Sequence, residues 1–392
     1  QYKNELYLND NIGLRPFFIR LGNQYQFSLF RQSNSAFSII GKDDVLYQEH
    51  FINAITGKDF LGSDSINELA RQFKFIQDSL SKKGVHLFFN ICPGKASYFP
   101  EFIPDNIKEK IVHPDSTNYA AMVRYFNKHQ VNHIDMNRWF LEMKPKTEYP
   151  LYPKNDIHWG MYGAYVASDS LLKYLNKATN KTYPKLVLDS MYQTDTVIAA
   201  EEHLEKVLNL FQELEDYPMY YPEFHYENVS PSNGKTLVIA DSYYLSLKSL
   251  DLHSKGFNES GDIYYFKKLV HDTLRFKLVA KYWKPSIDSL IQAHDAVMVL
   301  SSEGNFKNLG FGFIQELYGL YTNSPLYAER KKEEWIENMI SVIRNSKKWN
   351  EKIIKSAQEL GKPYEAVLRQ NAQYMYYTKF VKPKRTKTPS GN

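Results

Sequence analysis

Two short segments of the sequence hold residue types that together could activate a hydroxyl group. Asp156 and His158 lie two positions apart in the run NDIHWG, and side chains at that spacing in an extended segment project to the same side. The Asp156 carboxylate could therefore hold one ring nitrogen of His158 and leave the other free. Ser242 follows the apolar run TLVIA, within ADSYY. A carboxylate, a histidine base and a hydroxyl are the parts that serine-dependent acyl transfer needs.

The spacing by itself leaves a structural interpretation open. Asp-x-His triplets and serines after strands arise often by chance. Asp156 and His158 could instead form a helix N-terminus, in which the carboxylate accepts backbone N–H groups. Asp241 and Ser242 could likewise cap the next helix. The residues alone therefore do not decide between a catalytic triad and two helix caps.

The chain around these segments alternates between helical and extended patterns. Periodic runs with caps predict helices, and short apolar runs predict strands. Helices are expected at residues 17–31, 64–82, 117–129, 160–177 and 287–293, strands at 85–91, 131–136, 236–240 and 296–300, and a hairpin at 38–48. Strands that are apolar on both faces and separated by helices indicate a parallel sheet covered by helices on both sides.

A parallel sheet would gather the chemistry at one edge. Ligands bind in open α/β sheets at the carboxyl ends of the strands, and Ser242 directly follows the strand at 236–240. Its backbone N–H would then point to where an oxyanion develops. The polar segment SSEGN (301–305) follows the last strand and should lie on the same rim.

Composition narrows the function further. The 392 residues are 43% hydrophobic and 24% charged, which is ordinary globular usage. The net charge of +5 is spread along the chain except for the basic run at 379–387. Because no phosphate loop, zinc finger or RNA-binding signature accompanies it, we expect no nucleic-acid partner. Aromatic residues make up 15%, including 30 tyrosines; they suit a wet, sugar-holding groove, although compositional bias explains them as well.

Cysteine and histidine usage predicts neither a disulfide nor a cofactor. The one cysteine, Cys92, lies in an apolar run and is expected to be buried. His129 and His133 are four residues apart, a zinc-binding spacing on a helix, but they lack the glutamate of HExxH and span a predicted helix-to-strand break. We therefore expect no metal site.

The chain is expected to have three parts: a catalytic domain over 1–325, a C-terminal helical appendage over 326–381, and a disordered tail over 382–392. From about Pro325 the sequence changes to long charged helical runs. No stretch approaches the 18 uncharged apolar residues of a membrane span. Because the chain begins at Gln1 rather than Met, we expect a targeting segment to have been removed.

The two chemical motifs resemble those of the SGNH-hydrolase-like proteins of the alginate O-acetyltransferase group (the AlgX/AlgJ type, also called DHHW proteins). That family places an Asp-x-His-Trp motif before a Gly-Asp-Ser-Phe-type nucleophile motif, a permuted order compared with ordinary SGNH esterases. Here the motifs read DIHW (156–159) and ADSY (240–243). Further similar blocks lie at 7–15, 41–51, 84–104 and 295–313, so that the resemblance covers about residues 5–320. Ala240, Asn155 and Tyr243 depart from the family glycine, threonine and phenylalanine.

The resemblance implies an SGNH-hydrolase-like α/β fold in which Ser242, His158 and Asp156 are catalytic. It also implies a periplasmic or extracellular protein, membrane-anchored in its full-length form by a segment before Gln1. Members move acetyl groups onto polysaccharide hydroxyls, often receiving acetyl from a membrane-bound O-acyltransferase. The oxyanion and substrate contacts are less defined; the residues considered for them are Asp241, Tyr243, Tyr264, Tyr265, Asn305, Trp159 and Lys95.

Three functions follow as hypotheses. The first is an O-acetyltransferase that passes acetyl from Ser242 to hydroxyls of an exopolysaccharide or cell-envelope glycan. The second is a carbohydrate acetylesterase with the same triad, which differs only in using water as the acceptor. The third is a non-catalytic glycan-binding or assembly protein with a decayed site, which the Ala240 departure leaves open.

Overall fold

The computed structural model describes residues 13–35, 37–111, 116–194, 203–212, 214–215, 218–258, 262–265, 268–271, 278–279 and 287–382. The chain divides into two compact units, Gln1–Gln315 and Glu316–Asn392. This division falls earlier than the domain boundary expected after residue 325. Each unit has its own core, and each is described by itself.

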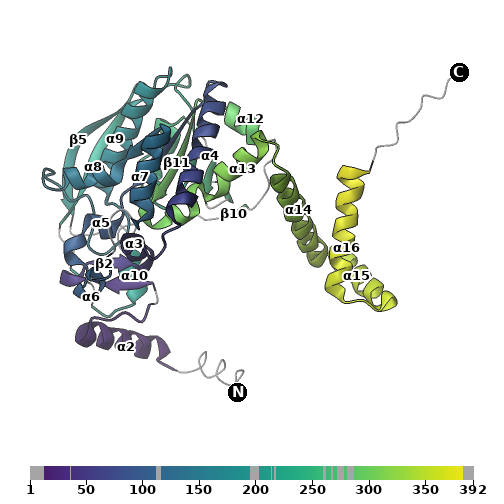
Figure 1. The fold of residues 1–392 in the computed structure, drawn as a ribbon. Helices are drawn as coiled ribbons and strands as arrows, with labels where there is room; N and C mark the ends of the chain where they lie inside the picture. The colour runs from purple at the N-terminus through teal and green to yellow at the C-terminus, as the bar shows by residue number, and fades with distance from the viewer. Residues whose placement is uncertain are drawn as a thin grey trace. The chain divides into compact units, whose positions relative to one another are not determined.

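A seven-stranded sheet forms the centre of the first unit (Figure 1). Its order is β10-β9-β8-β7-β11-β3-β4. The strands are β3 (His86–Cys92), β4 (His133–Asp135), β7 (Thr236–Ala240), β8 (Asp262–Tyr265), β9 (Lys268–His271), β10 (Leu278–Val279) and β11 (Ala296–Ser302). The run from β4 to β8 is parallel, as expected, whereas β9 and β10 add an antiparallel edge that the sequence did not predict.

Helices cover both faces of this sheet. Adjacent β3 side chains point to opposite faces, and their contacts show which helices lie on each. The Phe89 ring lies 6.0 Å from Phe73 of α4 (Ser63–Ser81) and 5.4 Å from Phe126 of α7 (Asn118–His129). The Phe88 ring lies 4.9 Å from Tyr174 of α9 (Met161–Ala178) on the other face. The helices predicted at 64–82, 117–129 and 160–177 are thus confirmed as α4, α7 and α9, and Figure 1 shows them against the sheet.

Smaller elements surround the sheet. The predicted hairpin at 38–48 is confirmed as β1 (Ser38–Ile40) and β2 (Leu46–Gln48), with Ser38 opposite Gln48. The predicted helices at 17–31 and 287–293 are confirmed as α2 (Arg15–Phe30) and α12 (Ile287–Gln292). Elements that the sequence did not predict include the pair β5 (Lys185–Thr194) and β6 (Met219–Glu227), and the helices α3 (Glu49–Ile55), α5 (Lys95–Tyr98), α6 (Asp105–Lys108), α8 (Met136–Met143), α10 (His203–Leu208), α11 (Tyr243–Ser249) and α13 (Phe313–Tyr321).

The second unit is built mainly from three helices, α14 (Pro325–Asn345), α15 (Lys347–Leu360) and α16 (Tyr364–Tyr376). They bury a small core of their own that includes Ile336, Ile343 and Leu368. The expected C-terminal helices are therefore present, whereas residues 383–392 of the expected tail lie outside the described part of the chain. Among the described residues, no helix has both the length and the apolar character to cross a membrane.

Candidate active site

Ser242 lies where β7 gives way to α11. The strand ends at Ala240, and Ser242 is the N-cap residue of the helix, with φ −61° and ψ −22°. Because β7 pairs with β11 on one side and β8 on the other, Ser242 stands at the carboxyl edge of the sheet's parallel part. This is the edge at which α/β sheets hold their ligands.

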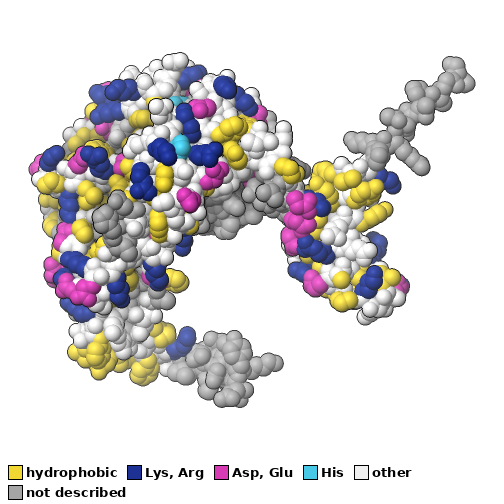
Figure 2. All heavy atoms as spheres, in the orientation of Figure 1, with side chains coloured by type: hydrophobic (Ala, Val, Ile, Leu, Met, Phe, Trp, Pro, Cys, Tyr) yellow, Lys and Arg dark blue, Asp and Glu magenta, His cyan; other side chains and the backbone are white. Residues whose placement is uncertain are grey.

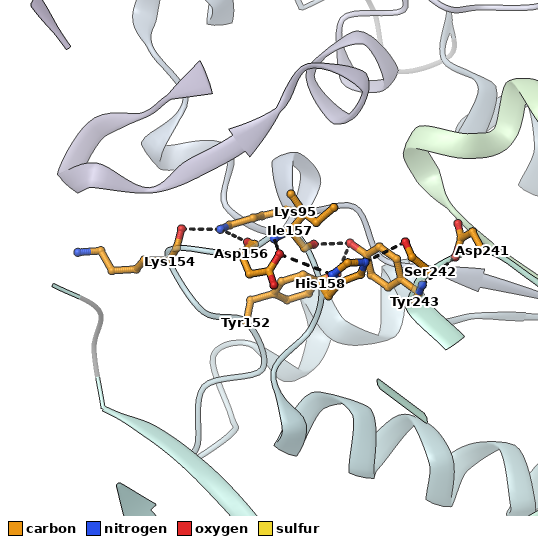
Figure 3. A network of polar contacts seen from close by, with 9 residues as sticks. All are labelled: Lys95, Tyr152, Lys154, Asp156, Ile157, His158, Asp241, Ser242 and Tyr243. Carbon is orange, nitrogen blue, oxygen red and sulfur yellow. Dashed lines mark hydrogen bonds and ion pairs between the residues drawn. The ribbon is translucent and has the colours of Figure 1, made fainter. Parts of the chain in front are cut away.

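The loop between α8 and α9 brings Asp156 and His158 to the same edge (Figure 3). The Nε2 atom of His158 lies 2.9 Å from Ser242 Oγ, and its Nδ1 atom lies 3.6 Å from Asp156 Oδ1. The Asp156 side chain is fully buried, whereas that of His158 is 16% exposed. Three side chains from two distant segments thus form a carboxylate–imidazole–hydroxyl row whose hydroxyl end meets the rim.

Asp156 is held by its own backbone surroundings as well as by His158. Its Oδ1 accepts the N–H of Ile157 at 2.5 Å. The 3.6 Å separation from His158 Nδ1 exceeds hydrogen-bond length but is within reach of an ion pair when the ring is protonated. Catalytic hydrogen bonds are often long in the absence of substrate and tighten when it binds.

Lys95 fixes the loop that carries Asp156. Its side chain is completely buried, and its ammonium donates to the carbonyl oxygens of Lys154, at 2.6 Å, and of Asp156. Lys95 was among the residues considered for oxyanion and substrate contacts, and the structure does not support that role, because the ammonium is turned into the protein. Lys95 instead joins the start of α5, after β3, to the triad loop.

Tyr243 and Trp159 support His158 from behind rather than facing substrate. Both are 1% exposed, and their rings lie 5.3 Å apart. Tyr243 Oη donates to the Ile157 carbonyl at 2.6 Å, and its ring centroid is 5.0 Å from that of His158. Burial raises the pKa of Tyr243 well above its ordinary value, so its phenol stays protonated and keeps donating. The expected substrate contacts of these two residues are therefore not supported.

Asp241 joins the ends of two neighbouring strands. Its Oδ2 accepts the Ser302 N–H and the Ser302 hydroxyl, each at 2.7 Å, and the Asn305 amide at 2.9 Å. Its Oδ1 accepts the Tyr243 N–H at 3.1 Å. The segment at 301–305 thus lies on the Ser242 rim, as expected. The side chains of Asp241 and Asn305 hydrogen-bond to each other, and their expected role as oxyanion or substrate groups stays a prediction.

Tyr264 and Tyr265 lie in β8, opposite Ile239 and Ala240 of β7. This pairing puts their backbone next to the strand that leads to Ser242. Their side chains lie outside the described part of the structure. Their expected role as oxyanion or substrate groups stays a prediction.

Sequence reasoning missed two titratable residues on this rim, His50 and Glu303. His50 of α3 packs against Gly304, and burial, with the charges of Lys307 and His158, lowers its pKa to about 4. Glu303 accepts the Ser97 hydroxyl at 2.5 Å, and burial raises its pKa to about 7. Glu303 lies in the polar run after β11, and His50 lies in the block at 41–51, but neither segment singled out the residue as a titratable group.

The residues considered for metal binding are engaged elsewhere. His129 Nε2 lies 2.7 Å from Asn67 Oδ1, and His133 Nδ1 lies 2.8 Å from the Val131 carbonyl. Within the described ranges, no group of three or more His, Cys, Asp or Glu side chains is arranged to hold a metal ion. Cys92 is buried, and burial raises its thiol pKa well above the ordinary value, so it stays protonated.

Comparison with known proteins identifies relatives of this arrangement. Residues 39–242 match the family model described as an SGNH hydrolase-like domain, acetyltransferase AlgX. The curated relative described as a probable alginate O-acetylase AlgJ, from Pseudomonas syringae pv. tomato, is 25% identical over 167 residues, which are 43% of this chain and 40% of the relative. The chain thus matches about two fifths of that protein's length.

Two solved structures are also similar. The O-acetyltransferase domain of Pseudomonas putida AlgJ is 15% identical with a TM-score of 0.46, over 72% of this chain and 99% of that one. Pseudomonas aeruginosa AlgX is 13% identical with a TM-score of 0.45, over 74% and 71%. The family match spans more than half of the chain and includes Asp156, His158 and Ser242. The chain belongs to the SGNH hydrolase-like acetyltransferase family of the AlgX type.

Proposed function

We propose that this protein is a polysaccharide O-acetyltransferase that carries the acetyl group on Ser242. The observation that carries this proposal is the 2.9 Å contact between His158 Nε2 and Ser242 Oγ, with the buried Asp156 carboxylate behind the ring. A nucleophile, its base and an orienting carboxylate in this order are the parts of covalent acyl transfer. Membership of an acetyltransferase family names the acyl group.

In the first half-reaction, His158 Nε2 takes the Ser242 proton as Oγ attacks the carbonyl carbon of an acetyl donor. The Ser242 backbone N–H, at the start of α11, is the donor we propose for the oxyanion. When the tetrahedral intermediate collapses, the bond from carbon to the leaving group breaks. The leaving group takes the proton from His158, and acetyl-Ser242 remains.

In the second half-reaction, a polysaccharide hydroxyl gives its proton to His158 Nε2 and attacks the acetyl carbon. The bond between this carbon and Ser242 Oγ then breaks, and His158 returns the proton to the serine. Asp156 stabilises the imidazolium in both halves through its charge and holds the ring orientation. The cycle needs no metal or redox cofactor to balance.

We also propose the setting in which this reaction occurs. The name of the relative, a probable alginate O-acetylase, suggests an acidic polysaccharide as the first acceptor to try. An extracytoplasmic location, and a donor supplied by a membrane-bound O-acyltransferase, are parts of the same proposal. They rest on the resemblance of the two motifs alone.

The test separates transfer from hydrolysis. The purified chain is incubated with an activated acetyl ester, with and without alginate oligosaccharides, and acetylated sugar is measured by mass spectrometry. We expect acetylated oligosaccharide with the intact chain and none with Ser242→Ala. Acetate release that no sugar acceptor changes would make the protein an acetylesterase, and oligosaccharide binding without any acyl turnover would make it a binding protein.

A further inference from the structure

Helix α2 exposes a continuous apolar stripe. Phe18, Leu21, Tyr25 and Leu29 are spaced three or four residues apart, which places them on one face of a helix. Their exposed fractions run from 48% for Leu21 to 62% for Leu29. We call these four residues the α2 stripe. Figure 2 shows hydrophobic side chains gathered at the lower edge of the first unit, where Figure 1 places α2.

The opposite face of α2 is already committed to the protein body. Phe27 is 6% exposed and packs in a cluster with Leu204 and Leu208 of α10. Asn23 donates to the Leu208 carbonyl at 2.9 Å, and Arg20 donates to the Asn209 side chain at 2.9 Å. These contacts hold the helix against the protein body, so the exposed stripe is the face that this docking leaves free. The helix is docked on one side and apolar on the other.

The charged residues of α2 itself, Arg15 and Arg20, have one sign. Between Asp10 and Asp43 the sequence contains no acidic residue, but it contains Arg15, Arg20, Arg31 and Lys42. Arg31 pairs with Asp44 at 2.6 Å, and Arg15 is exposed at the first turn of the helix. A basic helix with large apolar side chains on its free face is the pattern of helices that lie in the headgroup region of an anionic bilayer.

We propose that the α2 stripe inserts into the surface of an anionic lipid membrane. The helix lies in the plane of the headgroups, with Phe18, Leu21, Tyr25 and Leu29 reaching the acyl boundary. Arg15 contacts lipid phosphates at the edge of the stripe. This lipid contact is independent of the chemistry at Ser242.

The size of the stripe favours lipid over a second protein. A helix of 16 residues is about 24 Å long, and one such ridge presents a few hundred Å², whereas a standard protein interface buries roughly 800 Å² on each partner. A bilayer needs no such area, because each buried side chain contributes separately. A convex, basic ridge fits an anionic surface without a complementary groove.

The test measures binding of the full chain to protein-free vesicles. Cosedimentation is compared for zwitterionic phosphatidylcholine vesicles and for vesicles with phosphatidylglycerol added. We expect binding to the anionic vesicles that weakens with salt. Leu21→Ser/Leu29→Ser should lower the partition coefficient at least about tenfold, because each leucine loses its transfer free energy.

The matched control replaces two leucines of the same unit that are exposed elsewhere, Leu141→Ser/Leu188→Ser. It should bind vesicles like the unchanged chain, and acyl turnover should be the same in both double variants. Equal vesicle binding by the two double variants would overturn the proposal. Absence of binding to anionic vesicles would also overturn the proposal. This outcome includes the case in which the chain forms a dimer and Leu21→Ser/Leu29→Ser makes it monomeric.

Discussion

At the scale of single residues, the reactivity that we propose for Ser242 depends on the residues that contact each member of the triad. A serine hydroxyl is a weak nucleophile until a base takes its proton. In the proposed reaction His158 is that base, and the fully buried Asp156 offsets the charge that the ring gains. Asp156 in turn depends on backbone contacts, since Ile157 donates to its carboxylate and Lys95 to its carbonyl oxygen.

Replacing the triad members should separate chemistry from orientation. Ser242→Ala and His158→Ala should each lower acyl turnover by at least about 10³-fold without unfolding the protein, because nucleophile or base is lost. Asp156→Ala should keep a measurable remnant, since both survive. Turnover of an activated acetyl ester is the measurement. Asp169→Ala, which removes a carboxylate paired with Lys173 on α9, is the control and should retain full activity.

Lys95→Met tests whether the buried ammonium positions the triad. Methionine fills a similar volume but cannot hold the carbonyls of Lys154 and Asp156. We expect kcat to fall about tenfold or more with KM little changed, because small displacements of a catalytic group are costly. Lys42→Met, which removes an exposed pair with Asp105, is the control. A folded Lys95→Met protein with unchanged kcat would show that the loop is held without it.

The sequence predicted the chemical residues better than the residues that support them. Asp156, His158 and Ser242 could be singled out because their types suit one reaction and their motifs resemble those of a known family. Lys95, Tyr243 and Asp241 were expected to meet substrate, since a polar residue near a motif gives no sign of which way it points. Burial decides their direction, and burial depends on contacts between segments far apart in the chain.

At the scale of elements, close packing around the triad loop should make substitution of one glycine, Gly163, destabilising. A Cβ on Gly163, in the first turn of α9, would come within 2.5 Å of the Leu151 carbonyl oxygen. Gly163→Ala should therefore cost about 1–3 kcal/mol of unfolding free energy by overpacking. Gly22→Ala in α2 meets open space and should stabilise by about 0.5–1 kcal/mol through helix propensity. Urea unfolding of both variants checks the pair.

Glu303 should make stability depend on pH. Its folded pKa of about 7 lies above the ordinary 4.5, because of burial and the charges of Asp59 and Asp135. Between these pH values the folded state binds more protons than the unfolded state. The contribution of Glu303 to folding stability is therefore lost as pH rises from about 4.5 to 7. Glu303→Gln removes that loss, and its stability relative to the unchanged chain should rise by up to about 3 kcal/mol from pH 5 to pH 8.

His50 provides the matched variant with the opposite sign. Its folded pKa of about 4 lies below the ordinary 6.5, so its contribution is lost as pH falls through that range. The relative stability of His50→Gln should therefore rise as pH falls from 7 to 4. If unfolding measurements on Glu303→Gln and His50→Gln give parallel pH profiles, the assigned pKa directions are wrong.

At the scale of the whole molecule, the sequence predicted the parallel centre of the sheet but not its margins. The apolar runs of β3, β7 and β11 are buried along nearly their whole length, so their composition revealed them. The β5–β6 pair mixes aromatic, charged and proline residues over partly exposed faces. Such strands are stabilised by contacts with neighbouring strands, and these contacts leave no apolar run in the sequence.

The most direct test of the account is the intact mass of the chain after exposure to an activated acetyl ester. The geometry of Ser242, His158 and Asp156 predicts a gain of one acetyl group that maps to the peptide containing Ser242. The adduct should be lost when a sugar acceptor is added, and it should be absent from Ser242→Ala. An acetyl group found only on lysines, or equally on the Ser242→Ala protein, would contradict the account.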